Sequence, residues 1–150
     1  MTILSGTPVD ILLIEDNPGD VRLMREALKD YRVQNKLWVV SDGLKAMAFL
    51  HKEGEFCEAP RPDLILLDLN LPRKDGRWVL QEIKNNESLR KIPVVILTTS
   101  SAEADILKAY ELHANCYITK PLDLEQFINV VMSIEGFWLT IVKLPPKEEA

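Results

Sequence analysis

The sequence has no apolar run that approaches the roughly 18 residues needed to span a membrane. Its first residues contain neither the basic segment nor the apolar stretch of a signal peptide. Its only cysteines, Cys57 and Cys116, form neither a disulfide framework nor a metal-ligand cluster. Basic residues are few, 18 against 23 acidic ones, and a net charge of −5 argues against a nucleic-acid binder. We therefore expect a cytoplasmic protein without membrane or nucleic-acid partners.

Short apolar runs and helical patterns alternate five times along a chain of 150 residues, a length that suits one domain. Runs rich in Ile, Leu and Val are typical of parallel strands that are covered on both faces. The predicted strands are Ile11–Glu15, Leu37–Val40, Leu64–Asp68, Val94–Thr98 and Cys116–Ile118. This alternation predicts an α/β fold with an open, doubly wound, five-stranded parallel sheet.

The segments between and after these strands have the apolar spacing of amphipathic helices. Their apolar positions are Val21, Met24 and Leu28; Leu44, Met47 and Ala48; Val79 and Ile83; Ile106, Ala109 and Tyr110; and Phe127, Val130, Val131 and Ile134. Asn17 followed by Pro18 suits the start of the first helix, as N-cap and first residue. The Asp42-Gly43 pair indicates a turn. The stretch 52–62 is long and contains two prolines, so we expect a surface loop there.

Polar side chains follow four of the predicted strands. Glu15 and Asp16 end the first strand, Asp68 ends the third, and Thr98 ends the fourth. Lys120 follows the fifth strand. In open α/β sheets, ligands bind outside the carboxyl ends of the strands, so these five side chains should share one site.

The chemistry of these residue types suits a divalent cation and a phosphoryl group. Mg²⁺ prefers oxygen ligands and keeps several waters, so Asp16 and Asp68 could bind it directly and Glu15 through water. A carboxylate can also act as a nucleophile and form an aspartyl-phosphate. Lys120 could neutralise the phosphoryl oxygens, and Thr98 could donate a hydrogen bond to them. Each residue alone also fits a cap, a strand end or a solvated charge, but their combination favours the site.

This pattern resembles the receiver domain of two-component response regulators, over residues 9–134. Two spacings agree with that family: 30 residues separate Asp68 from Thr98, and 22 separate Thr98 from Lys120. The interval between Asp16 and Asp68 is longer than usual, and the stretch 52–62 can hold the insertion. The matching motifs are Glu15-Asp16, Asp68 in Asp-Leu-Asn-Leu-Pro, Gly76, which closes the following loop, Thr98, and Lys120-Pro121.

The resemblance implies a flavodoxin-like fold in which a histidine kinase phosphorylates Asp68, giving 4-aspartylphosphate. It implies Thr98 and Lys120 as further catalytic residues and Mg²⁺ as the cofactor, for which Mn²⁺ can substitute. The implied metal ligands are Glu15, Asp16, Asp68 and the backbone carbonyl of Asn70. The implied switch residues are Thr98, Tyr117 and Pro121. Tyr117 fits an ordinary strand aromatic equally well.

Three further segments resemble the response regulators that serve phytochrome-type histidine kinases. They are the sequence from Asp68 to Arg77, the sequence from Ala109 to Tyr117, and Gly136-Phe137-Trp138-Leu139. We therefore divide the chain into an N-terminal extension (1–8), a receiver domain (9–134) and a C-terminal extension (135–150). The apolar extension could close the core of its own domain or reach a second copy and build a homodimer. The second option is favoured.

Other functions fit the sequence less well. A hydrolase or phosphatase with an aspartate nucleophile would carry a second Asp where this chain has Asn70. A flavin-binding domain would need a phosphate loop after the first strand, where this chain has Glu15 and Asp16. A P-loop motif is absent. A receiver-like scaffold that is never phosphorylated remains as an alternative, although no key residue is missing.

Overall fold

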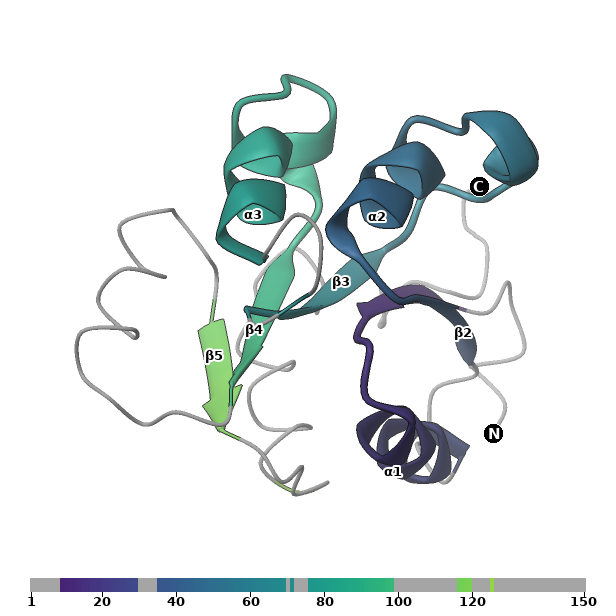
Figure 1. Ribbon diagram of the computed structural model, residues 1–150, viewed down its shortest axis with the longest axis vertical. Helices are drawn as coiled ribbons and strands as arrows, with labels where there is room; N and C mark the ends of the chain where they lie inside the picture. The colour runs from purple at the N-terminus through teal and green to yellow at the C-terminus, as the bar shows by residue number, and fades with distance from the viewer. Residues whose placement is uncertain are drawn as a thin grey trace, which may run out of the picture.

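A five-stranded parallel sheet forms the centre of the protein in the computed structural model (Figure 1). The structure describes residues 9–29, 35–69, 71, 76–98, 116–119 and 125. The strands are β1 (Val9–Ile14), β2 (Asn35–Val40), β3 (Leu64–Asp68), β4 (Val94–Thr98) and β5 (Cys116–Thr119). Their order in the sheet is β2-β1-β3-β4-β5, so the chain winds outward in both directions from β1. The predicted doubly wound sheet is therefore confirmed.

The predicted bounds of β3 and β4 are confirmed, whereas those of the other strands differ by one or two residues. β1 and β2 each begin two residues earlier than expected, because Val9 pairs with Asn35 and Asp10 with Lys36. Glu15 lies just beyond β1, although its N–H still donates to the carbonyl of Val40 at 3.0 Å. β5 is one residue longer than expected.

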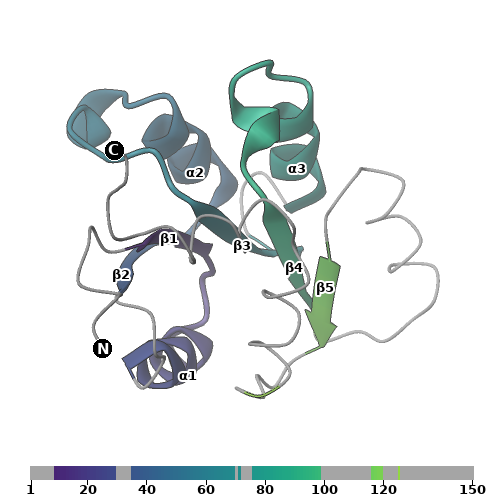
Figure 2. The same cartoon turned by 180° about the vertical axis from the view of Figure 1, so that it is seen from behind.

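Helices cover both faces of the sheet. α2 (Gly43–Leu50) and α3 (Gly76–Lys84) lie on one face, and α1 (Pro18–Lys29) lies on the other, as both views show (Figures 1 and 2). Two short 3-10 helices, η2 (Gly54–Phe56) and η3 (Leu89–Lys91), follow α2 and α3. The fourth and fifth predicted helices lie outside the described residues. No helix in the described part of the chain is long and apolar enough to cross a membrane.

The core consists of two apolar layers, because successive side chains of a strand point to opposite faces. Leu12, Ile14 and Leu67 belong to the layer that packs against α2 and α3, and none of them is exposed to solvent. Among the described side chains of α1, Met24 and Leu28 are buried, as the apolar spacing predicts, whereas Val21 is only half-buried. Burying each such side chain stabilises the fold by roughly 1.5–3 kcal/mol.

The predicted apolar face of α3 is confirmed, whereas that of α2 is partly wrong. In α3, Val79 and Ile83 are completely buried. In α2, Leu44 is 44% exposed, and Phe49 and Leu50 face the core instead. Most residues of α2 are apolar, so its sequence spacing does not decide which side faces the sheet.

The stretch 52–62 runs over the surface, as predicted, but it is anchored to the core. Lys52 and Gly54 have positive φ angles of 57° and 58°, which turn the chain out of α2. Phe56 then packs on Phe49, with ring centroids 5.4 Å apart, and Phe49 in turn packs on Trp38 at 5.9 Å. The longer interval between β1 and β3 therefore holds a small folded unit.

Candidate metal centre at the carboxyl edge of the sheet

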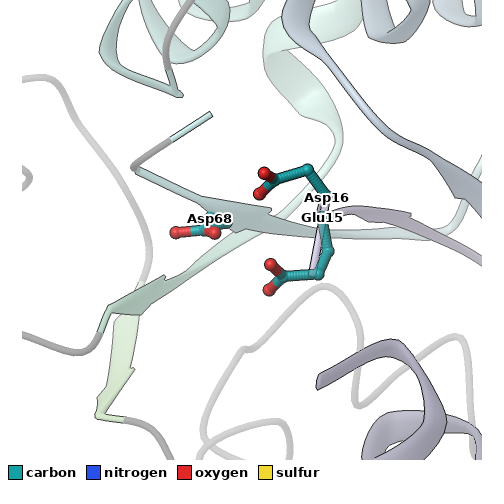
Figure 3. Close-up of side chains that lie close together, drawn as sticks. All are labelled: Glu15, Asp16 and Asp68. Atoms are coloured by element: carbon teal, nitrogen blue, oxygen red, sulfur yellow. The ribbon is translucent and has the colours of Figure 1, made fainter. Parts of the chain in front are cut away.

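Three carboxylates meet at the carboxyl ends of β1 and β3 (Figure 3). The two strands are neighbours, and Ile14 pairs with Leu67, so Glu15 and Asp68 follow in step at the same edge. Asp16 comes next along the chain. One oxygen from each of the three side chains lies within 4.8 Å of the others. The structure thus brings together three of the predicted metal ligands.

The burial and charge of this cluster suit a hard cation. Glu15 is 1% exposed and Asp68 is 4% exposed, whereas Asp16 is open to solvent. Placing several carboxylates together with two of them buried is costly unless their charge is compensated. The donor atoms are all oxygens, as Mg²⁺ and Mn²⁺ prefer, and the exposed side leaves room for the waters that Mg²⁺ retains. These residues therefore fit a divalent cation.

Hydrogen bonds of Asn17 link the acid pair Glu15-Asp16 to the first turn of α1. The N–H of Asn17 donates to Glu15 Oε2 at 3.2 Å. Asn17 Oδ1 accepts the N–H of Asp20 at 3.0 Å, and the carbonyl of Asn17 accepts the N–H of Val21. The predicted N-cap is confirmed, and the same residue that starts the helix also orients Glu15.

The backbone positions of two other predicted site residues are described. Asp68 pairs with Leu97, so Thr98 ends β4 one residue beyond this pair. Tyr117 lies in β5, as predicted, opposite Ile96. The side chains of Thr98 and Tyr117 are outside the described part of the structure, as are the whole of Asn70, Lys120 and Pro121.

Asp42, for which the Asp42-Gly43 pair predicts only a turn, is a buried acid at the same edge of the sheet. It is 5% exposed and caps α2, because its Oδ1 accepts the N–H of Lys45 at 2.8 Å. An Asp between a strand and an apolar helical segment is a recognisable N-cap, so the sequence did contain this signal. Asp42 therefore has a structural role in placing α2.

A second acid pair lies at the opposite, amino-terminal edge of the sheet and was not predicted. Asp63 Oδ2 accepts the N–H of Asp10 at 2.9 Å, and Asp10 Oδ1 accepts the indole N–H of Trp38 at 3.0 Å. Burial raises the pKa of Asp63, and the charge of Asp10 adds to this rise. The length of β3 separates this pair from the cluster of Glu15, Asp16 and Asp68.

Comparison with known proteins identifies the family. A model of the response regulator receiver domain matches residues 11–132. The chain belongs to this family. Receiver domains bind Mg²⁺ and receive their phosphoryl group from a histidine kinase. Membership of this family therefore implies a histidine kinase as a partner of this chain. The receiver is thus part of a signalling switch, as its sequence predicts.

The most similar relatives include response regulators of phytochrome signalling. Rcp1 of Synechocystis sp. is 54% identical over 141 residues, which cover 94% of this chain and 96% of Rcp1. The crystal structure of Mn²⁺-bound Rcp1 superposes with a TM-score of 0.76 at 54% identity, covering 93% of this receiver and 100% of the chain in that crystal structure. The phosphorylated cyanobacterial phytochrome response regulator RcpA gives a TM-score of 0.77 at 53% identity, with the same coverage.

Proposed function

We propose that this receiver is a stand-alone, cytoplasmic switch that accepts a phosphoryl group on Asp68 from a phytochrome-type histidine kinase. The observation that carries the proposal is the convergence of Glu15, Asp16 and Asp68 at one sheet edge. Asp68 is the acid at the end of the central strand β3, beside the acid pair that follows β1. The similarity to Rcp1 and RcpA supports the choice of kinase class.

Asp16 and Asp68 would hold Mg²⁺ or Mn²⁺ directly, with Glu15 bound through water and the carbonyl of Asn70 as a further ligand. The bound cation would neutralise charge on the phosphoryl oxygens. The arrangement gives the three carboxylates different tasks. Glu15 is buried and accepts the N–H of Asn17, so its carboxylate is held in place, whereas the exposed Asp16 can be replaced by water as a ligand of the ion.

In the reaction, a carboxylate oxygen of Asp68 attacks the phosphorus of the kinase phosphohistidine. The new P–O bond forms as the P–N bond breaks, and the electron pair remains on the imidazole nitrogen, which takes up a proton. Water later attacks the phosphorus and releases inorganic phosphate, which restores Asp68. Lys120 would supply positive charge, and the hydroxyl of Thr98 would donate to a phosphoryl oxygen. The chain turns over no separate substrate.

The signal would pass from the site through neighbouring strands. Thr98 and Thr119 pair at the ends of β4 and β5, and Tyr117 is opposite Ile96. An inward movement of the Thr98 hydroxyl would therefore act on the strand that carries Tyr117 and leads to Pro121. This is a local charge change that biases a two-state element.

Phosphotransfer with and without Mg²⁺ tests the proposal. A phytochrome-type kinase should label the wild-type chain with one base-labile phosphate, in a manner that requires the metal. Asp68→Asn should remain unlabelled, whereas the control Asp63→Asn, at the other end of β3, should be labelled normally. Labelling of Asp68→Asn equal to the wild type would refute the assignment.

The output of the switch is proposed to pass through protein contacts in a homodimer, without nucleic acid. The apolar segment 136–144 of the C-terminal extension is the proposed arm. Light scattering on the full chain and on a chain lacking 136–150 tests this idea. The full chain should dimerise and the truncated chain should not. A truncated chain that dimerises equally tightly would rule out the arm.

A further inference from the structure

Gly76, the first residue of α3, lies directly against the main chain of Asp68. A Cβ atom built on Gly76 would meet the carbonyl oxygen of Asp68 at 2.3 Å and Cα of Leu69 at 2.6 Å. Real Cβ atoms essentially never come closer than 3.0 Å to a neighbour, and both neighbours here are backbone atoms. Only glycine therefore allows this approach of helix to strand.

Both sides of this contact are held in place by further contacts. On the helix side, Val79, Leu80 and Ile83 are completely buried, so α3 is held firmly on the sheet. On the strand side, Asp68 pairs with Leu97. A hydrogen bond from the N–H of Gly76 to the carbonyl of Leu69, at 3.0 Å, ties the two sides together.

We infer that Gly76 is a positioning residue of the metal and phosphoacceptor site. Its missing side chain lets α3 hold the main chain of Asp68 where its carboxylate can share a cation with those of Glu15 and Asp16. The inference rests on the proposed function for the role of Asp68 in phosphorylation, but its metal-binding part can be tested separately.

The size of the required movement decides the expected effect. The Asp68 carbonyl would have to recede by about 0.7 Å to reach 3.0 Å from an alanine Cβ. Mg²⁺ demands near-ideal octahedral geometry at about 2.0–2.1 Å, and metal sites tolerate deviations of only about 0.2 Å. Ca²⁺ accepts longer and more irregular coordination. A displaced Asp68 should therefore impair Mg²⁺ and Mn²⁺ binding more than Ca²⁺ binding.

The test compares two glycine-to-alanine variants of the full chain by calorimetric titration with Mg²⁺, Mn²⁺ and Ca²⁺. Gly76→Ala should bind Mg²⁺ and Mn²⁺ roughly tenfold or more weakly, with a smaller loss for Ca²⁺. Gly54→Ala is the matched control: its φ of 58° makes alanine strained, yet a Cβ there meets no atom within 4 Å. This control should lose stability and keep wild-type affinity for all three ions.

Phosphorylation provides the second measurement. Gly76→Ala should accept phosphate on the order of tenfold to a hundredfold more slowly, since a shift near 1 Å can cost that much. If Gly76→Ala does not fold in buffer, the titrations are repeated in an osmolyte that favours the folded state. Unchanged Mg²⁺ affinity in folded Gly76→Ala, equal losses for Mg²⁺ and Ca²⁺, or failure to fold in osmolyte each overturn the inference.

The two proposals can fail separately. Normal labelling of Asp68→Asn would refute the proposal that Asp68 is phosphorylated, but it would not change the meaning of the metal titrations of Gly76→Ala. Conversely, a Gly76→Ala chain that binds Mg²⁺ normally would refute the positioning role of Gly76, while the labelling of Asp68→Asn would still test whether Asp68 is the phosphoacceptor.

Discussion

Removing the charge of Asp68 should stabilise the metal-free protein. One oxygen each of Glu15, Asp16 and Asp68 lies within 4.8 Å of the others. At that separation two unit charges repel by about 1 kcal/mol in a water-like medium and by about 3.5 kcal/mol at an effective dielectric constant of 20. The pair of Asp68 with exposed Asp16 belongs near the lower value, and its pair with buried Glu15 lies nearer the upper value.

Asp68→Asn keeps the shape of the side chain and removes both repulsions. Some of this gain is lost, because hydrogen bonds to a charged acceptor are worth about 1.5–3 kcal/mol and weaken when the acceptor becomes neutral. We expect a net stabilisation of about 1–3 kcal/mol, which corresponds to an increase in Tm of several degrees for a domain of this size.

Urea denaturation in a chelator at pH 7 and low ionic strength measures this effect. Glu82→Gln, on the exposed side of α3, makes the same change in net charge and serves as the control. Excess Mg²⁺ should then reverse the order, since a ligand at 1,000 times its Kd stabilises the native state by about 4.1 kcal/mol and the variant binds it weakly. An Asp68→Asn chain no more stable than the wild type in chelator would refute the reasoning.

Three further outcomes are expected. Asp16→Ala should weaken Mn²⁺ binding roughly tenfold or more in calorimetric titration, through loss of a direct ligand; unchanged affinity would contradict that role. Lys120→Met should still accept phosphate slowly but show no phosphorylation-dependent change in partner binding or dimerisation, because the charge that couples the phosphoryl group to the switch is gone. A normal response of this variant would exclude the coupling role of Lys120. Asp63→Asn should be more stable than the wild type at pH 7. Burial and the Asp10 charge raise the pKa of Asp63, so the ionisation of Asp63 costs stability as pH rises. Urea midpoints should therefore show the advantage of the variant shrinking as pH falls toward 3.8. An advantage that does not change with pH would contradict this cause.

The sequence predicted the centre of the sheet better than its margins. β3 and β4 are continuous apolar runs that end sharply in Asp68 and Thr98, so composition alone sets their bounds. β2 begins with the polar residues Asn35 and Lys36, and Asp10 interrupts the apolar run of β1, so pairing between Asp10 and Lys36 extends both strands beyond their apolar runs. Asp10 is accommodated in β1 through the indole of Trp38, a contact between residues 28 positions apart that no local pattern reveals.

The cluster of three carboxylates could be predicted because strand order and register bring Glu15 and Asp68 side by side. The tight contact between Gly76 and the main chain of Asp68 could not, because it depends on how α3 packs on the sheet. The orientation of α2 was missed for a similar reason. Its sequence is apolar on most sides, and only packing leaves Leu44 exposed and Phe49 buried.

The strand order also bears on how the chain folds during synthesis. β2, β1 and β3 are contiguous in the sheet and all lie within the first 68 residues, so this half can pair before β4 and β5 leave the ribosome. All three clustered acids are then already present, whereas Thr98 and Lys120 have not yet left the ribosome. The nascent sheet must therefore form with its acids crowded together, so we expect Mg²⁺ to favour the folding of this half of the sheet.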